Sequence, residues 1–201
     1  MTGRTTAKLV PLRRAVDAVV VLSDEALLAA TATGDLVALD ALFERFHAAV
    51  YRFLGRLAAA DDAARDDLVQ ATFLEARRGA RRFRGGSSVK TWILGIAANL
   101  ARHHLRGERR RREKHARYAE GLYAVPERPD ERFERHELLR EIEEALARLP
   151  HDLRVAFIMC DLEDVPGVEA ARVVGVPQGT LWRRLHVARK AVRAAVERAT
   201  Q

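Results

Sequence analysis

The chain has 201 residues, of which 48% are hydrophobic, so it is long enough to bury one core or two small ones. This composition excludes a chain that is disordered throughout. The 35 Lys and Arg residues outnumber the 28 Asp and Glu residues and give a formal net charge of +7. Such an excess predicts a polyanionic partner, either nucleic acid or an anionic membrane surface.

The N-terminal residues 1–22 place basic side chains ahead of the apolar run AVDAVVVL, an order that resembles a signal peptide. Asp17 interrupts that run, acidic residues follow it, and nothing in the chain approaches the roughly 18 uninterrupted apolar residues of a membrane span. The single cysteine, Cys160, excludes an internal disulfide, and a buried thiol is its simplest interpretation. We therefore expect a cytoplasmic protein with no stable membrane insertion.

Helical periodicity begins at Ser23, which stands as an N-cap before DEALLAA. Residues 39–57 carry apolar side chains at steps of three and four, and a second amphipathic segment runs from Asp66 to Phe83. A loop with two glycines and two serines then leads into TWILGIAANLARHHLR, which starts apolar and turns basic. No period-two strand pattern competes, so the predicted fold class is all-α.

A change of composition predicts two small helical domains joined by a flexible linker. The linker, residues 108–134, is rich in charge and contains prolines but few apolar side chains. A new apolar period begins at Leu138. The expected organisation is an N-terminal extension over 1–22, a helical domain over 23–107, the linker, and a second helical domain over 135–201.

The clearest motif is PGVEAARVVGVPQGTLWRRLHVARKAVRAAV, in which a short helix reaches Gly175 and a new helix starts near Gln178. In the second helix, the positions expected to face the core are Leu181, Leu185, Ala188, Val192 and Val196. The remaining face is almost wholly basic, as the recognition helix of a helix-turn-helix domain requires for contacts to base edges and phosphates. A solvated cationic helix is the alternative interpretation.

These segments resemble the extracytoplasmic-function (ECF, group IV) sigma factors, two-domain subunits that direct bacterial RNA polymerase to promoters. DDLVQATFLEARRGARRFRGGSSVKTWILGIAANLARHHLR is similar to the family's region 2, and LPHDLRVAFIMCDLEDVPGVEAARVVGVPQGTLWRRLHVARKAV is similar to its region 4. The resemblance implies core RNA polymerase and promoter DNA as partners, with the minus-35 element bound as duplex and the minus-10 element as a melted strand. It also implies an anti-sigma factor as a further partner, and we expect the free chain to be a monomer.

The resemblance implies three sets of site residues. The polymerase-binding set is Asp66, Asp67, Leu68, Gln70 and Phe73. The minus-10 set, in which cations hold the backbone of a separated strand and other groups contact an extruded base, is Arg84, Ser87, Ser88, Lys90, Asn99, Arg102, His103 and Arg106. The minus-35 set, on the second helix of the helix-turn-helix, is Gln178, Thr180, Trp182, Arg183, Arg184, His186, Arg189 and Lys190.

Some positions depart from the family pattern and bear on the promoter sequence. Val89 stands where the family usually has an aromatic residue, and Trp182 with Arg183 replaces commoner small or lysine-type residues. Trp92 has two interpretations, a core residue between Ile93 and Ile96 or a platform on which a base stacks.

An enzyme is one competing interpretation, because RRFRGGSSVKT superficially resembles a phosphate-binding loop. The Walker pattern requires Gly immediately before Lys and a preceding strand, whereas Val89 precedes Lys90 and a helix precedes the loop. No GxSxG or HExxH motif is present, and adjacent His103 and His104 point in different directions on a helix, which makes them poor joint metal ligands. We expect no catalytic activity, no cofactor and no metal.

A stand-alone helix-turn-helix repressor or activator is the second competing interpretation, with residues 23–107 serving as a dimerisation or ligand domain. Such a protein binds its duplex operator alone, usually as a dimer on half-sites one helical turn apart. A sigma factor needs core polymerase to bind promoter DNA specifically.

Overall fold

The computed structural model describes the backbone of residues 22–57, 61–116 and 135–199. Helices and short turns make up these segments, and no strand occurs in them. The predicted all-α fold is confirmed. All but the last residue of the expected N-terminal extension, and residues 117–134 of the expected linker, lie outside the described residues.

Residues 22–116 form what we call the N-terminal unit. Its elements are α2 (Asp24–Ala32), α3 (Leu36–Leu57), α4 (Asp62–Gly79), a 3₁₀ turn η1 (Ala80–Arg82) and α5 (Val89–Ala116). Helix α4 begins at Asp62 rather than at Asp66, because Asp61 caps it: the Asp61 Oδ1 accepts from the Ala64 N–H at 2.8 Å. The last turn before Phe83 is 3₁₀ rather than α-helical.

Polar side chains set the starts of the other helices in this unit. The predicted N-cap Ser23 is confirmed, since its Oγ accepts from the Ala26 N–H at 3.2 Å. The Asp35 Oδ1 accepts from the N–H groups of Val37 and Ala38 at the start of α3. The Ser88 Oγ accepts from the Thr91 N–H at 3.0 Å and thereby begins α5.

Helices α3 and α5 supply much of the core of the N-terminal unit. The predicted apolar stripe of α3 is buried at Leu42, Phe46, Val50, Phe53 and Leu57. The first half of α5 buries Ile93, Leu94, Ala97, Ala98 and Ala101, as its apolar start predicts. Helix α5 continues past the expected domain boundary at Gly107, because residues 108–116 are mostly good helix formers and include neither Gly nor Pro.

Residues 135–199 form the C-terminal unit. Its elements are α6 (Arg135–Arg148), α7 (His151–Phe157), a π-helical turn η2 (Ile158–Leu162), α8 (Gly167–Val174) and α9 (Gln178–Ala199). Gly175 ends α8 in the left-handed conformation, with φ of 71° and ψ of 39°. Helices α8 and α9 therefore form the predicted helix-turn-helix, with Leu181, Leu185, Ala188 and Val192 buried.

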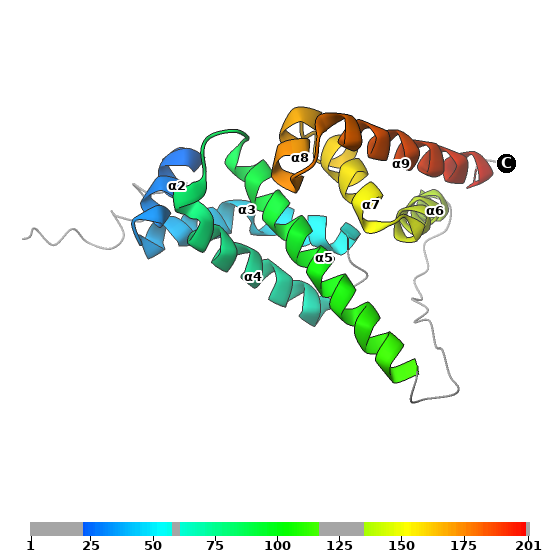
Figure 1. The fold of residues 1–201 in the computed structure, drawn as a ribbon, viewed down its shortest axis with the longest axis horizontal. Helices are drawn as coiled ribbons and strands as arrows, with labels where there is room; N and C mark the ends of the chain where they lie inside the picture. Colours follow the sequence, from blue (N-terminus) through cyan, green and yellow to red (C-terminus); the bar gives the residue numbers. More distant parts are fainter. Residues whose placement is uncertain (1–21, 58–60, 117–134, 200–201) are drawn as a thin grey trace, which may run out of the picture.

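The two units pack against each other. Helix α5 lies along α8, and α3 lies against α6 and α7 (Figure 1). The approach of α8 to α5 is close at Gly95, where an added Cβ would lie 2.7 Å from the Cβ of Val173. One continuous cluster of buried side chains therefore runs through both units.

Candidate DNA and polymerase interfaces

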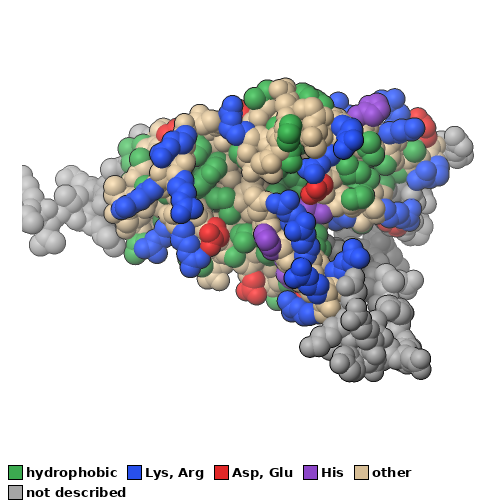
Figure 2. Space-filling view, viewed as in Figure 1, with side chains coloured by type: hydrophobic (Ala, Val, Ile, Leu, Met, Phe, Trp, Pro, Cys, Tyr) green, Lys and Arg blue, Asp and Glu red, His purple; other side chains and the backbone are tan. Residues whose placement is uncertain are grey.

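The exposed side of α9 carries most of the predicted minus-35 set. Burial of the apolar stripe leaves Gln178, Trp182, Arg183, His186 and Lys190 exposed, and we call these residues the α9 face. Thr180 is half-buried. Figure 2 shows Lys and Arg side chains over α9 and over the middle of α5. The α9 face can therefore meet a polyanion without any movement inside the C-terminal unit.

Trp182 is exposed to 46% and still has a packing role. Its indole lies over the start of α8, where a Cβ added to Gly167 would lie 2.7 Å from the Trp182 Cζ2. Only a glycine fits beneath the ring at this separation. Trp182 thus fixes the angle between the two helices of the motif as well as facing solvent.

Two arginines of the predicted minus-35 set pair with carboxylates of the C-terminal unit itself. The Arg184 Nη2 lies 2.7 Å from the Asp152 Oδ2. Arg189 donates to Asp161 through Nε at 2.9 Å and through Nη2 at 2.6 Å, and this pairing raises the pKa of Arg189. These pairs hold α9 against α7 and η2, so the two arginines help to orient the helix.

The loop before α5 holds the first residues of the predicted minus-10 set. Gly85 has a φ of 69°, and Arg84 is exposed and donates to the Arg81 carbonyl at 3.3 Å. The Ser87 Oγ donates to the Ser88 carbonyl at 3.2 Å, and the Ser88 Oγ donates to the Thr91 Oγ1 at 2.8 Å. Both serine hydroxyls are therefore engaged in the loop and the helix cap.

Carboxylates from the C-terminal unit meet the start of α5. The Lys90 Nζ lies 2.8 Å from the Glu163 Oε2, and the Ser88 backbone N–H donates to the Glu169 Oε2 at 3.0 Å. Glu163 also pairs with Arg56 of α3, whose Nη1 lies 3.2 Å from its Oε1. Two acidic side chains of one unit thus occupy cationic and N–H groups of the other.

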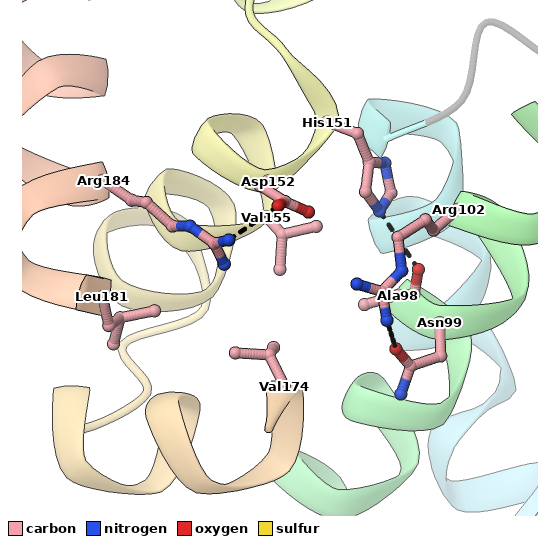
Figure 3. Close-up of a pocket in the computed structure, with 9 residues that line it drawn as sticks. All are labelled: Ala98, Asn99, Arg102, His151, Asp152, Val155, Val174, Leu181 and Arg184. Atoms are coloured by element: carbon pink, nitrogen blue, oxygen red, sulfur yellow. Dashed lines mark hydrogen bonds and ion pairs between the residues drawn. The ribbon is translucent and has the colours of Figure 1, made fainter. Parts of the chain in front are cut away.

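A small pocket lies where α5 meets α7, α8 and α9 (Figure 3). Asn99 and Arg102 of the minus-10 set line it together with Asp152 and Arg184. The Arg102 Nη2 donates to the Asn99 Oδ1, and both side chains are half-buried. The structure therefore brings residues predicted for two separate DNA elements to a single junction.

His151 also lines this pocket and bonds across it. Its Nε2 lies 3.2 Å from the Ala98 carbonyl oxygen, while its buried Nδ1 has no hydrogen-bond partner (Figure 3). Burial lowers the pKa of His151, which fits a neutral ring that donates from Nε2. His103 and Arg106 of the minus-10 set are exposed.

The predicted polymerase-binding set divides between surface and core. Asp66, Asp67 and Gln70 are exposed on α4, whereas Leu68 and Phe73 are buried, with 8% and 4% of their surface exposed. The Phe73 ring packs edge-on against another ring of the core, that of Phe43, with centroids 4.9 Å apart. The polar members can meet a partner directly, and the two apolar members hold α4 in place.

Comparisons with known proteins assign both units. The Sigma-70 region 2 model matches residues 42–111, and the Sigma-70 region 4 model matches residues 139–192. The ECF RNA polymerase sigma factor SigM of Mycobacterium tuberculosis is 34% identical over 167 residues, which cover 83% of this chain and 81% of that protein. This chain belongs to the ECF sigma factors.

Further relatives and solved structures agree with this assignment. The ECF sigma-E factor of Haemophilus influenzae is 29% identical, and the match covers 88% of this sigma factor and 96% of that protein. The fold is similar to that of CnrH in complex with the cytosolic domain of CnrY, with a TM-score of 0.62, 22% identity, and coverage of 87% of this chain and 97% of that one. It is also similar to sigma factor RpoE from Bartonella quintana in complex with the anti-sigma factor NepR, with a TM-score of 0.55, 22% identity, and coverage of 77% and 94%.

Membership of this family makes the chain a subunit that brings RNA polymerase to promoter DNA, and a stand-alone repressor is not favoured. The named relatives are sigma factors, a non-catalytic family. Among the described residues, no group of three His, Cys, Asp or Glu side chains is placed to hold a metal ion. None of the helices described is long and apolar enough to cross a bilayer.

Several residues of this sigma factor were missed by sequence reasoning. Glu169 lies in α8 and Glu163 lies before that helix, and neither belongs to the basic face of α9, so no spacing rule marked them. Arg154 is buried at 9% exposure and donates to the carbonyl oxygens of Leu57 at 2.6 Å, Leu149 at 3.0 Å and Ala147. The sequence signal that could have identified Arg154 is a single arginine among the apolar residues of α7.

Trp92 and Cys160 can also be placed. Trp92 is half-buried, and its ring centroid lies 5.5 Å from that of Phe83. It packs against the core and also against Gly79, where an added Cβ would lie 3.2 Å from the Trp92 Cζ2. Cys160 is half-buried rather than fully buried, and this burial raises the pKa of its thiol.

Proposed function

We propose that this sigma factor divides promoter recognition between its two units. The α9 face reads the duplex minus-35 element, the first half of α5 and its preceding loop hold the melted minus-10 strand, and the exposed side of α4 binds core polymerase. The observation that carries this proposal is the order of the two matched regions, 42–111 and 139–192, combined with a cationic exposed face on the second helix of a helix-turn-helix.

Within the α9 face, Arg183 and Lys190 are the side chains proposed to contact DNA most directly. Both are exposed, Arg183 in the second turn of α9 and Lys190 near its middle, where an arginine can pair with a guanine edge and a lysine can reach a phosphate. Arg184 and Arg189 contribute through their pairs with Asp152 and Asp161, which set the orientation of α9.

For the minus-10 strand, the proposed contacts come from Lys90, Asn99 and Arg102, which we call, together with Ser88, the α5 surface. A lysine and an arginine can neutralise strand phosphates, and the Asn99 amide can bond to the edge of an extruded base. Asp66, Asp67 and Gln70 are the proposed polymerase contacts, because they are exposed on a helix whose apolar side is buried in the unit.

The proposal extends to location, oligomeric state and a regulatory partner. We propose that the chain acts as a cytoplasmic monomer, with residues 23–107 and 135–201 as its two domains. The solved structures of similar fold are complexes, one with the cytosolic domain of CnrY and one with the anti-sigma factor NepR. These complexes support an anti-sigma factor as a partner of this chain.

Run-off transcription with core polymerase and fragmented genomic DNA tests the proposed function. Promoter-specific transcripts should appear only when both the chain and core polymerase are present. Duplex binding by the chain alone, as a dimer on half-sites one helical turn apart, would favour the repressor instead. No transcript from any genomic promoter would contradict the proposal.

A further inference from the structure

We infer that, before core polymerase binds, the C-terminal unit partly covers the α5 surface, and that Glu163 and Glu169 take the places of DNA phosphates there. This inference rests on the proposed minus-10 role of the α5 surface. It adds to that role an off state built into the chain itself, in which region 4 blocks region 2.

Glu163 is the centre of the closed arrangement. Its carboxylate bridges Arg56 of α3 and Lys90 of α5, and only 7% of its side chain is exposed. A carboxylate removed from water to this extent needs cationic partners, and here both partners belong to the other unit. The contact is therefore specific to the closed form, because opening the units separates Glu163 from both cations.

Glu169 occupies a second anion position. Its Oε2 accepts from the backbone N–H of Ser88, the residue immediately before α5. N–H groups at the start of a long helix attract anions, because they lack partners inside the helix and carry the positive end of its dipole. A phosphate of the melted strand and the Glu169 carboxylate would compete for the same N–H group.

The backbone next to Glu163 is held in an unusual conformation. The π-helical turn η2 precedes it, and the Glu163 N–H donates to the Ile158 carbonyl at 2.9 Å. Asp164 follows with a φ of 53°, in the left-handed region that non-glycine residues seldom adopt. Such conformations persist where surrounding contacts require them, and the contacts here direct Glu163 toward Arg56 and Lys90.

The units also fit together sterically. Gly95 of α5 meets Val173 of α8, with only 2.7 Å between an added Cβ and the Val173 Cβ, and Gly86 meets Arg172 in a similar way. Arg154 of the C-terminal unit donates to the carbonyl of Leu57, the last residue of α3. Side chains shaped to each other hold the units together in addition to the charges.

The residues proposed to bind polymerase remain accessible in the closed arrangement. Asp66, Asp67 and Gln70 are exposed while Lys90, Asn99 and Arg102 are partly or wholly engaged at the junction. Core polymerase can therefore dock on α4 first and then separate the units. Only the open fraction of molecules can bind a strand. The apparent affinity of the free chain for single-stranded DNA is therefore reduced in proportion to that fraction.

The test uses the full chain and two ways of opening it. Gly95→Ala changes no charge and favours the helix, but its methyl group collides with Val173. Gly107→Ala on the same helix is its matched control, because the nearest atom to an added Cβ is the Arg111 Nη2 at 3.8 Å.

The second way of opening the chain is Glu163→Gln with Glu169→Gln, which removes the two carboxylates. Glu143→Gln with Glu144→Gln, two exposed positions on α6, removes the same charge away from the junction.

Two measurements are made on each protein: the radius of gyration by small-angle scattering, and the affinity for a short labelled single-stranded DNA of random sequence by fluorescence anisotropy. We expect both opening variants to be more expanded than the wild type and to bind the strand about tenfold more tightly. The two control variants should match the wild type in expansion, with at most a small gain in affinity for the α6 pair from its added charge.

Equal radii of gyration for the wild type and both opening variants would overturn the inference. Expansion of the variants without tighter strand binding would also overturn it, because the C-terminal unit would then not be what blocks the strand. Run-off transcription with core polymerase separates these results from a failure of the proposed function. A wild-type chain that directs promoter-specific transcription yet is already open would contradict the closed state alone, whereas absence of promoter-specific transcription with the wild type and with every variant would contradict the sigma role.

Discussion

Both proposed DNA-binding helices, α9 and α5, carry cations that pair with carboxylates, but the carboxylates come from different units. On α9, Arg189 pairs with Asp161 of the same unit. On α5, Lys90 pairs with Glu163 of the other unit. The α9 face is therefore formed by the C-terminal unit alone, whereas the α5 surface depends on where the two units lie.

This difference suggests an order of events. A preformed minus-35 face can recognise duplex DNA as soon as the chain is delivered by polymerase. The α5 surface becomes fully accessible only after the units part, which suits a surface that binds a strand existing only after the promoter has begun to melt. Keeping that surface covered also protects it from other single-stranded nucleic acid, because cationic sites bind such chains with little sequence preference.

The contrast between the α9 face and the α5 surface requires that the junction between the units contribute to stability. Replacement of Arg154 is the strongest test of this contribution. Arg154→Leu removes a buried guanidinium that bonds across the junction to the carbonyl of Leu57 and, within its own unit, to the carbonyls of Ala147 and Leu149. We expect the free energy of unfolding to fall by about 2–3 kcal/mol, since hydrogen bonds to charged groups are strong when buried. Urea unfolding followed by circular dichroism measures the loss.

The matched control for Arg154 is Arg148→Ala. Arg148 is exposed and pairs with Glu144 one turn away on α6, an interaction worth at most about 0.5 kcal/mol. A loss for Arg154→Leu no larger than that of this control would show that the junction is not a stabilising contact.

Arg183→Ala tests whether the α9 face acts independently of the position of the N-terminal unit. Loss of one base contact should weaken minus-35-dependent initiation by about 1–3 kcal/mol and leave the radius of gyration unchanged. The double replacement of Arg183 and Arg184 by Ala should weaken it further, because Arg184 also orients α9 through Asp152. Run-off transcription from promoters with intact and altered minus-35 elements measures both effects.

Arg198→Ala provides the comparison for Arg183, because it is an exposed arginine in the last turn of the same helix. Promoter discrimination that is unchanged in Arg183→Ala and in the double variant would refute the assignment of the α9 face.

Acid should weaken the junction but not the α9 face, through His151. Its ring faces the Ala98 carbonyl, and the charged groups around it are Asp152, Arg154 and Arg102. Burial lowers the pKa of His151 below its ordinary value of 6.5, so the separated state takes up a proton more readily than the closed state. The closed form should therefore lose stability as the pH falls below 6.5 toward the lowered pKa, by at most about 1.4 kcal/mol per pH unit for one proton.

Small-angle scattering at about pH 7.5 and about pH 5.5 measures this effect, because His side chains titrate between these values. His151→Gln keeps an N–H donor for the Ala98 carbonyl and cannot titrate. An expansion at low pH that is as large in His151→Gln as in the wild type would assign the effect to other groups.

The smallest expected effect concerns the turn inside the C-terminal unit. Gly175→Ala places a Cβ on a residue with a φ of 71° in otherwise open space, so only backbone strain opposes it. We expect a loss of about 1 kcal/mol in the free energy of unfolding, with the contacts between the units unchanged. Thermal unfolding measures it. Gly179→Ala, with ordinary backbone and equally open space, should not destabilise the protein, and an equal loss in both variants would contradict this account.

The local features of the fold could be predicted from the sequence because neighbours in the chain determine them. Ser23 caps α2 through a residue three positions away, and Leu181, Leu185 and Ala188 show their shared face by spacing alone. The same spacing left Arg183 and Lys190 outside, and the structure places both on the surface.

The junction between the units could not be predicted in this way. The partners Lys90 and Glu163, or Leu57 and Arg154, are far apart in the chain, and no periodicity links them. Helix α4 starts at Asp62, four residues before the expected Asp66, because the apolar period begins late in this helix and the Asp61 Oδ1 caps its first turn. Residues 108–116 were predicted to belong to the linker because of their high charge, but their helix propensity extends α5 through them.

The distance between the two units, measured in the free chain and in its complex with core polymerase, tests the central claim most directly. Spin labels at Arg77→Cys on α4 and Arg193→Cys on α9, both exposed positions, in a Cys160→Ser background allow double electron–electron resonance. We expect one short distance in the free chain and a longer one after core polymerase binds. The same long distance in both states would contradict the claim that the C-terminal unit covers the α5 surface until polymerase separates the units.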